Sequence, residues 1–145
     1  MSMEKALAVA KAARTGFLAT TDGQRPSVRP MAGLRWVGKE LWIACALKSR
    51  KVRDLRARSW AEICFMDKSC NHVRIAGRCK ISASPRDRSV LLKLMPFLKN
   101  YVSGPDDPDY AVIRLRPSSI RWMPFTEMKY HEVLGKTGPK SRARR

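Results

Sequence analysis

Residues 41–55 have the sequence LWIACALKSRKVRDL, and the period of the hydrophobic residues changes inside this stretch. Residues 41–47 are continuously apolar, which predicts a buried strand over residues 40–47. From Ser49 onward the apolar residues Val52 and Leu55 recur at helical spacing, and serine is a common cap at a helix start. The stretch therefore predicts a strand that passes almost directly into a helix.

The basic cluster between the two elements is Lys48-Ser-Arg-Lys51, which we call the basic junction. Free backbone N–H groups and the positive end of the helix dipole meet a serine hydroxyl and cations there, a combination that binds phosphate well. Two more segments place cations on predicted strands, Val28-Arg-Pro-Met31 and His72-Val-Arg74. Exposed basic residues are often only surface charge, but the position of this cluster after an apolar strand favours an anion site.

Short strands separated by turns are predicted before and after the junction. The predicted strands cover residues 17–22, 27–37, 60–66, 72–82, 111–115, 120–125 and 129–134, with a turn at residues 116–119. Helices are predicted over residues 3–14 and from Ser84 to Leu98, where Pro96 is expected to kink or split the second helix. Because βαβ alternation is absent, this order predicts a mainly β protein, an antiparallel barrel with accessory helices outside it.

Length and composition are those of one folded domain with an unusually basic surface. The chain has 145 residues, of which 44% are hydrophobic. We expect one domain over residues 1–135 and a basic, disordered tail over residues 136–145. The net charge is +18, and the tail holds five of the 30 basic residues, so the domain itself keeps an excess of positive charge. Such a surface attracts anions: nucleic acid, acidic membranes or phosphorylated small molecules.

Several function classes find no support in the sequence. It contains no hydrolase, zinc-protease, P-loop or Rossmann motif, so a bound cofactor would carry the chemistry of an enzyme. Cys70 and His72 could supply half a metal site, but no complete ligand set is visible, and the four cysteines are expected to be free thiols. The lack of a long apolar stretch and of a signal peptide predicts a soluble cytoplasmic protein that does not bind membranes.

Several motifs occur in an order that is known from one protein family. They are Gly16-Phe-Leu-Ala-Thr20, Arg29-Pro-Met31, Leu41-Trp-Ile-Ala44, Ser49-Arg-Lys51-Val-Arg-Asp-Leu55 and Val73-Arg-Ile-Ala-Gly77. This pattern resembles the pyridoxamine 5'-phosphate oxidase-like, FMN-binding split-barrel family, from about Gly16 to Ile81. The segment from Ala111 to Trp122 resembles the closing strands of that family.

The resemblance implies a six-stranded antiparallel split β-barrel that forms a homodimer, with FMN at the subunit interface. It implies that Arg29, Arg50 and Lys51 hold the FMN phosphate, with Ser49 supporting it. It also implies that the backbone of residues 29–34 follows the isoalloxazine ring, and that Ala44 and Cys45 face the flavin or its ribityl chain. His72 stands near the position of a family glutamine that reaches the ring. The full set of implied cofactor-binding residues is Arg29, Pro30, Met31, Ala32, Gly33, Leu34, Ala44, Cys45, Ser49, Arg50, Lys51 and His72.

Departures from the family pattern narrow the expected reaction. Leu34 stands where the oxidase itself has a basic residue, and the C-terminal Trp/Arg/His signature for its substrate is missing. The chain resembles the shorter, general-stress-protein-like or flavin-reductase-like members, which implies an FMN-dependent oxidoreductase with an unidentified small-molecule electron donor or acceptor. Two alternatives stay open: an F420- or haem-binding relative on the same barrel, and a nucleic-acid-binding protein. Against the second, the exposed-aromatic motifs of RNA-binding sheets are absent.

Overall fold

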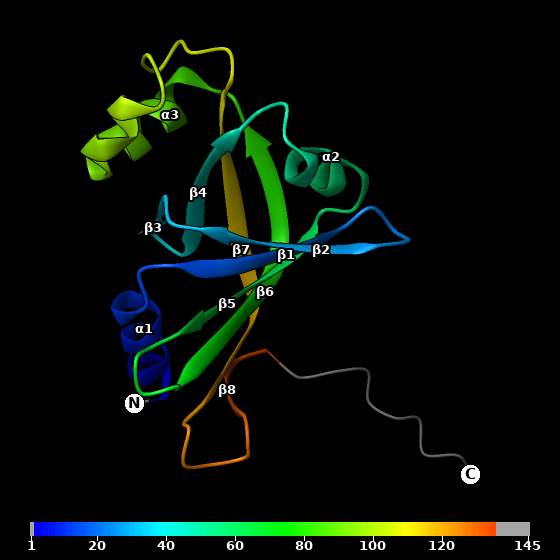
Figure 1. Ribbon diagram of the computed structural model, residues 1–145, viewed down its shortest axis with the longest axis vertical. Coiled ribbons are helices and arrows are strands. Elements are labelled where there is room, and N and C mark those ends of the chain that lie inside the picture. The colour runs from blue at the N-terminus through cyan, green and yellow to red at the C-terminus, as the bar shows by residue number, and fades with distance from the viewer. Residues whose placement is uncertain (1, 136–145) are drawn as a thin grey trace.

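The structure is a computed structural model that describes residues 2–135, which form one curled antiparallel sheet with helices around it (Figure 1). The strand order is β2-β1-β5-β6-β7-β4-β3, and β8 pairs with β7. The strands are β1 (Gly16–Thr21), β2 (Pro26–Met31), β3 (Leu34–Val37), β4 (Glu40–Ala46), β5 (Trp60–Met66), β6 (His72–Ser82), β7 (Tyr110–Met123) and β8 (His131–Leu134). The helices are α1 (Ser2–Ala12), α2 (Arg50–Ala57), α3 (Pro85–Leu94) and the 3-10 helix η1 (Pro96–Asn100). The predicted tail at residues 136–145 lies outside the described residues.

Alternate residues of the central strands form the main apolar core. In β5 and β6 the buried positions include Ile63, Phe65, Val73 and Ile75, and the residues between them are more exposed. A sheet with one buried face requires this alternation. Helix α1 adds its buried alanines to the same core, while α3 and η1 pack on the start of β7 in a second cluster. Figure 1 shows α1 and α3 at opposite ends of the sheet.

Helix α2 is tied to the sheet by one buried carboxylate. Asp54 is only 3% exposed, and its Oδ2 accepts a hydrogen bond of 2.8 Å from the Thr20 hydroxyl on β1. The Nη2 atom of Arg29, on β2, lies 4.0 Å from the same carboxylate oxygen. The Nε atom of Arg50, in the first turn of α2, lies 3.9 Å from it. The carboxylate therefore joins β1, β2 and α2 at one point.

Two strand predictions are wrong. The segment 27–37, predicted as one strand, is divided into β2 and β3, because β2 pairs with β1 while β3 pairs with β4 at the other end of the sheet order. The turn predicted at residues 116–119 is absent, because β7 runs through this segment as one strand. The six strands implied by the family resemblance are not confirmed, since residues 2–135 contain eight strands in one sheet.

A β-bulge lets β7 continue through the segment for which the sequence predicts a turn. The register between β6 and β7 shifts between Ala76 and Gly77, so that Ser118 is an extra residue on β7. Pro117 has no N–H group for the ladder, which explains why the local sequence resembles a turn. A Cβ atom on Gly77 would lie 1.9 Å from the carbonyl oxygen of Arg116. Glycine at position 77 therefore permits the close approach of the two strands.

Pro96 splits the second predicted helix, as expected. Helix α3 begins after Ser84, whose hydroxyl accepts a hydrogen bond of 3.1 Å from the Asp87 N–H. It ends at Leu94, and η1 begins at Pro96. Because the helix breaks here, Phe97 becomes part of a separate short helix that lines the candidate site.

Within residues 2–135, no helix is both long and apolar enough to cross a membrane. The same part of the chain contains no cluster of three or more His, Cys, Asp or Glu side chains that could hold a metal ion. Its four cysteines are free thiols, of which Cys70 is exposed and Cys79 is buried.

Replacing Asp54 with alanine should lower the free energy of unfolding by about 3 kcal/mol, because a buried hydroxyl and two guanidinium groups would lose their shared carboxylate. Equilibrium urea denaturation measures this change. Asp106→Ala removes an exposed loop carboxylate and is the matched control, with an expected change below about 0.5 kcal/mol. Equal stabilities of the two variants would contradict the role of Asp54 as the tie between α2 and the sheet.

Candidate functional site

The basic junction and Arg29 lie together at the N-terminal end of α2. Ser49 stands just before the first helical turn, with extended backbone angles (φ −90°, ψ 158°), and Arg50 and Lys51 begin the helix. Arg29 reaches the same place from β2, since Arg29 and Arg50 both approach Asp54. The structure thus brings together four residues that the family resemblance assigns to one phosphate.

Arg29 is held in place by oxygen atoms of two neighbouring strands. Its Nη1 atom donates to the Thr20 hydroxyl over 2.8 Å and to one backbone carbonyl each of β1 and β2 over 3.2 and 3.3 Å. Burial lowers the pKa of Arg29 from its usual value, and the charge of Asp54 opposes this effect more strongly than the charge of Arg50 adds to it. A guanidinium group stays protonated under these conditions. Arg29 is therefore a fixed positive charge at the start of α2.

Ser49 occupies the predicted cap position but does not cap the helix. Its side chain makes no capping hydrogen bond, which corrects the sequence prediction. The Oγ atom is buried and has no hydrogen-bond partner among the described residues. A buried hydroxyl without a partner costs about 1–3 kcal/mol. The Ser49 hydroxyl is therefore free to bond a ligand at the start of α2.

The charge of this region matches one phosphate group. Arg29, Arg50 and Lys51 carry three positive charges against the one negative charge of Asp54. Within residues 2–135, no carboxylate pairs with Lys51, and the first turn of α2 contains no acidic residue. A phosphate monoester carries about −1.5 to −2 charges near pH 7. The net charge of the four side chains thus balances that of a phosphate monoester.

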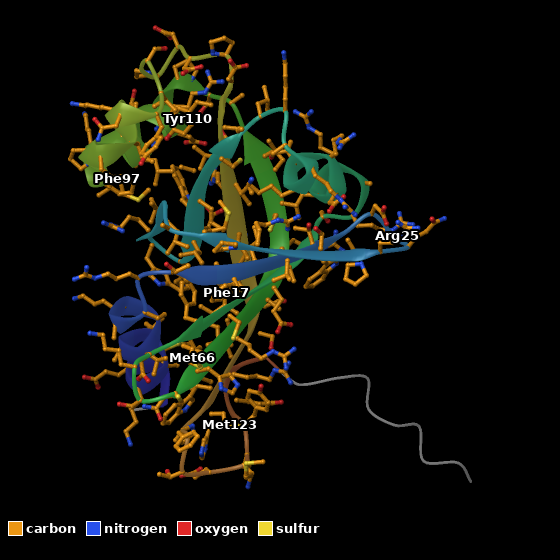
Figure 2. All side chains as sticks on the ribbon, in the orientation of Figure 1. Phe17, Arg25, Met66, Phe97, Tyr110 and Met123 are labelled. Carbon is orange, nitrogen blue, oxygen red and sulfur yellow. The ribbon has the colours of Figure 1, made fainter. Side chains whose placement is uncertain are left out.

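A groove of about 420 Å³ lies between β4 and η1. Ala32, Gly33, Ala44 and Cys45, all predicted cofactor residues, line it together, and we call it the Cys45 groove. Phe97 and Tyr110, labelled in Figure 2, also line it. The Ala44 N–H donates to the Gly33 carbonyl over 2.7 Å, and a Cβ on residue 33 would only reach ordinary contact distances of 3.4 and 3.5 Å. The side chains of Ala44 and Leu98 therefore bound the space beside Gly33.

Cys45 connects the groove to the basic junction. Burial raises the pKa of the Cys45 thiol to about 11, and the nearby Lys51 ammonium acts in the opposite direction. The thiol is therefore neutral near pH 7 and does not serve as a thiolate nucleophile. Burial also raises the pKa of the Tyr110 phenol to about 12. These two groups form neutral walls rather than catalytic bases.

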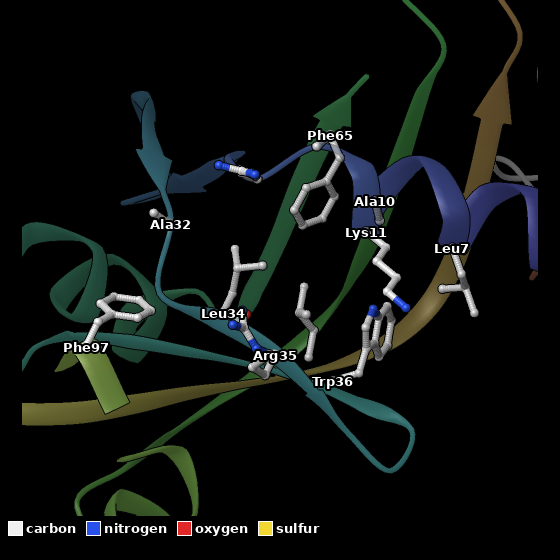
Figure 3. Close-up of a pocket in the computed structure, with 12 residues that line it drawn as sticks. Leu7, Ala10, Lys11, Ala32, Leu34, Arg35, Trp36, Phe65 and Phe97 are labelled. Carbon is white, nitrogen blue, oxygen red and sulfur yellow. The ribbon is translucent and has the colours of Figure 1, made fainter. Parts of the chain in front are cut away.

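A second groove of about 750 Å³ lies between α1 and β3 (Figure 3). Leu34, another predicted cofactor residue, lines it together with Trp36, and we call it the Trp36 groove. Ala32 and Phe97 line both grooves. The two grooves therefore meet at the segment between β2 and β3, along which the family resemblance lays the flavin ring.

Three predicted site residues lie neither in a groove nor at the basic junction with Arg29. Pro30 is exposed on β2, and Met31 packs against the apolar core. His72 is on β6, three strands from β2 in the sheet order, which corresponds to about 14 Å. Its Nε2 atom lies 2.7 Å from the Tyr130 hydroxyl. One chain alone therefore does not bring His72 to the basic junction.

Thr20 and Asp54 position the cations, and neither is among the predicted cofactor-binding residues. Asp54 is four residues after Arg50, so it resembles an ordinary exposed partner in a helical ion pair. Its hydrogen bond to Thr20 joins residues that are 34 positions apart. The one local signal is the place of Asp54 next to Leu55, which the helical pattern predicts to be buried.

Comparison with known proteins agrees with this fold. A family model described as Pyridoxamine 5'-phosphate oxidase matches residues 2–123. A NimC/NimA family protein from Clostridium acetobutylicum superposes with a TM-score of 0.79 and 23% identity, covering 90% of each chain. General Stress Protein 26 from Bacillus anthracis gives a TM-score of 0.72 and 22% identity, covering 92% of this chain and 100% of that chain. A comparison with curated proteins finds no match.

Further solved structures with this fold bind different cofactors according to their names. An FMN-binding, pyridoxamine 5'-phosphate oxidase-related protein from Nostoc punctiforme has a TM-score of 0.69 and 18% identity, covering 90% of this chain and 86% of that chain. A heme binding protein from Mycobacterium smegmatis has a TM-score of 0.74 and 19% identity, covering 91% of this chain and 58% of that chain. An F420 reductase has a TM-score of 0.63 and 23% identity, covering 78% of this chain and 93% of that chain. At these identities the likeness shows the shared fold alone.

The family model spans most of the chain. It includes the three α-helices and strands β1 to β7. The basic junction and both grooves lie within the matched residues. The chain therefore belongs to the pyridoxamine 5'-phosphate oxidase family, as its motifs predict.

Proposed function

We propose that the protein is an FMN-binding flavoprotein whose basic junction holds the cofactor phosphate. The observation that carries the proposal is the buried Ser49 hydroxyl, which lacks a partner among the described residues and lies at a helix start beside three cations. Family membership supports the proposal, as does the FMN-binding neighbour from Nostoc punctiforme.

The junction offers a phosphate donors that are already in position. Asp54 orients Arg29 and Arg50 toward each other, and the hydrogen bonds of Arg29 restrict its side chain before a ligand binds. Restricting the donors in advance lowers the entropy lost on binding. The Ser49 hydroxyl and the free N–H groups of the first turn of α2 add uncharged donors.

The Cys45 groove fits the rest of the cofactor. It lies next to Lys51 and leads to the backbone of Ala32 and Gly33, where small side chains leave space for the flavin ring. Ala44 and Cys45 both line this groove, so the ribityl chain would run along this part of β4. When bound, FMN supplies reversible hydride transfer between small molecules. The chain's own residues bind and orient the cofactor, which supports the proposal of an oxidoreductase.

We also propose that two copies form a homodimer through the outer face of β1, β2 and β5. Phe17, Val28 and Met66 are 49%, 66% and 56% exposed on these strands, and Figure 2 labels Phe17 and Met66. The strand register places Phe17 beside Pro30 and Cys64, which extends the apolar patch. Contiguous exposed apolar patches commonly mark protein interfaces. In such a dimer, His72 would reach a flavin only from the second copy.

F420 is the second candidate cofactor. It also carries a phosphate, so the basic junction would suit it, and one structural neighbour is named an F420 reductase. Haem is a further alternative, because another neighbour is named a heme binding protein. The three cofactors differ in their absorption spectra, so the spectrum of the purified protein distinguishes them.

Replacing both Arg50 and Lys51 with alanine should weaken FMN binding by about 100-fold. Each charge-assisted contact contributes about 1.5–3 kcal/mol, and the value for Arg50 is reduced because its side chain is 49% exposed. Titration of the apoprotein with FMN, followed by the quenching of flavin fluorescence, measures the change.

Arg53→Ala combined with Arg56→Ala is the matched control, because it removes two exposed charges from the same helix. This control should weaken FMN binding by less than about threefold, since exposed charges at a distance are screened by salt. Equal losses in the two double variants would mean that the overall charge attracts FMN. Unchanged affinity after loss of Arg50 and Lys51 would exclude the junction as the phosphate site.

Val28→Glu should convert the proposed dimer into monomers, because it places an unpaired charge in the middle of the apolar patch. Size-exclusion chromatography with light scattering measures the mass of each species. Met128→Glu, at a loop position that is 96% exposed, is the control and should remain dimeric. A monomeric wild-type protein, or a dimeric Val28→Glu variant, would contradict the proposed interface.

A further inference from the structure

The Trp36 groove carries positive charge that no acidic residue balances. Lys11 reaches it from α1, Arg14 from the segment after α1, and Arg35 from β3. None of the residues that line the groove is acidic, and Glu4 of α1 is not among them.

These cations lack strong partners within the part of the chain that the structure describes. The side chains of Lys11 and Arg14 have no hydrogen-bond or ion-pair partner among residues 2–135. Arg35 donates to the backbone carbonyl of its neighbour Leu34 over 2.9 Å and has no carboxylate partner in the same range. Three basic side chains are therefore available to an anion in the groove.

The remaining wall of the Trp36 groove is apolar and partly aromatic. Trp36, Phe65 and Phe97 contribute aromatic rings, and Leu34 lies between them (Figure 3). Leu41 also lines the groove. Such walls favour flat apolar ligands. A volume of about 750 Å³ lies within the range of about 300–1,000 Å³ that is usual for small-molecule sites. The groove therefore suits a ligand with an aromatic body and an anionic end.

The two grooves differ in charge although they share two residues. Asp107 and Asp109 line the Cys45 groove, whereas the Trp36 groove has only basic charged residues. An aromatic carboxylate that is too short to reach the basic junction would therefore favour the Trp36 groove. Ala32 and Phe97 line both grooves, so a ligand in the Trp36 groove would lie next to a flavin ring placed along residues 29–34.

We propose that the Trp36 groove binds an aromatic carboxylate. Its rings lie against Trp36 and Phe97, and its carboxylate lies near Lys11, Arg14 and Arg35. The binding site follows from the groove itself. Its role as the substrate site of a flavoprotein rests on the proposed function.

Two fluorescent probes with the same aromatic rings test the proposal on the full-length protein as purified. Anilinonaphthalene sulfonate is anionic, and N-phenyl-naphthylamine is its uncharged counterpart. The anionic probe should bind more tightly than the uncharged probe, because only the anion pairs with the three cations. Naphthoate should displace the anionic probe, whereas the uncharged naphthalenemethanol should not.

Lys11→Gln combined with Arg14→Gln should lower the affinity for the anionic probe by about tenfold. The same variant should leave the affinity of the uncharged probe within about twofold, because the apolar wall is intact. Trp36→Ala should lower the affinity for both probes, because it removes part of that wall. Lys5→Gln combined with Lys39→Gln is the matched control, since it removes two exposed charges outside the groove.

Three outcomes would overturn the proposal. Equal weakening of the anionic probe by the two glutamine double variants would mean that the overall charge of +18 attracts the probe. Unchanged affinity for the anionic probe after loss of Lys11 and Arg14 would show that these cations do not bind its anionic group. Unchanged binding of both probes to Trp36→Ala would place the probes elsewhere.

Failure of this proposal can be distinguished from failure of the proposed flavin site. The variant that lacks Arg50 and Lys51 should lose flavin but keep probe binding, because neither residue lines the Trp36 groove. Probe binding that depends on Lys11 and Arg14 in a protein without flavin affinity would support the groove and refute the proposed function. Flavin binding without probe binding would support the proposed function and refute the binding site in the Trp36 groove.

Discussion

The buried carboxylate of Asp54 is the contact on which the candidate site depends. It accepts a hydrogen bond from the Thr20 hydroxyl on β1 and lies within 4.0 Å of the guanidinium groups of Arg29 on β2 and Arg50 on α2. A buried charge is stable only where such partners satisfy it. Because these partners come from three elements, the carboxylate sets where α2 begins relative to the sheet. The fold therefore holds Arg29 and Arg50 close together before any anion is present.

The break between β2 and β3 has a comparable effect on the grooves. β2 pairs with β1 and β3 pairs with β4, so the chain crosses the sheet order at residues 32–33. The Gly33 carbonyl accepts a hydrogen bond from Ala44, which fixes this crossing to β4. The crossing has small side chains and lies where both grooves meet. A flat cofactor along this backbone would have the basic junction at one end and the Trp36 groove beside it.

Elements with a strong local pattern could be predicted from the sequence. β6 has its predicted bounds because buried and exposed residues alternate along it, and Ser49 marks the start of α2. The continuity of β7 could not be predicted, because Pro117 gives a local turn signal while Gly77, on another strand, supplies the space for the bulge. In the site, the cations are visible as a basic cluster. The positioning of these cations by Asp54 could not be predicted, because its partner Thr20 is distant in sequence.

The central claim is that the basic junction holds the phosphate of FMN. The most direct test compares the Kd of FMN with the Kd of riboflavin, which has the same ring and ribityl chain but no phosphate. Isothermal titration of the apoprotein measures both constants. We expect FMN to bind at least about 100-fold more tightly than riboflavin, because the phosphate adds charge-assisted contacts with Arg29, Arg50 and Lys51. Equal affinities for FMN and riboflavin would contradict it.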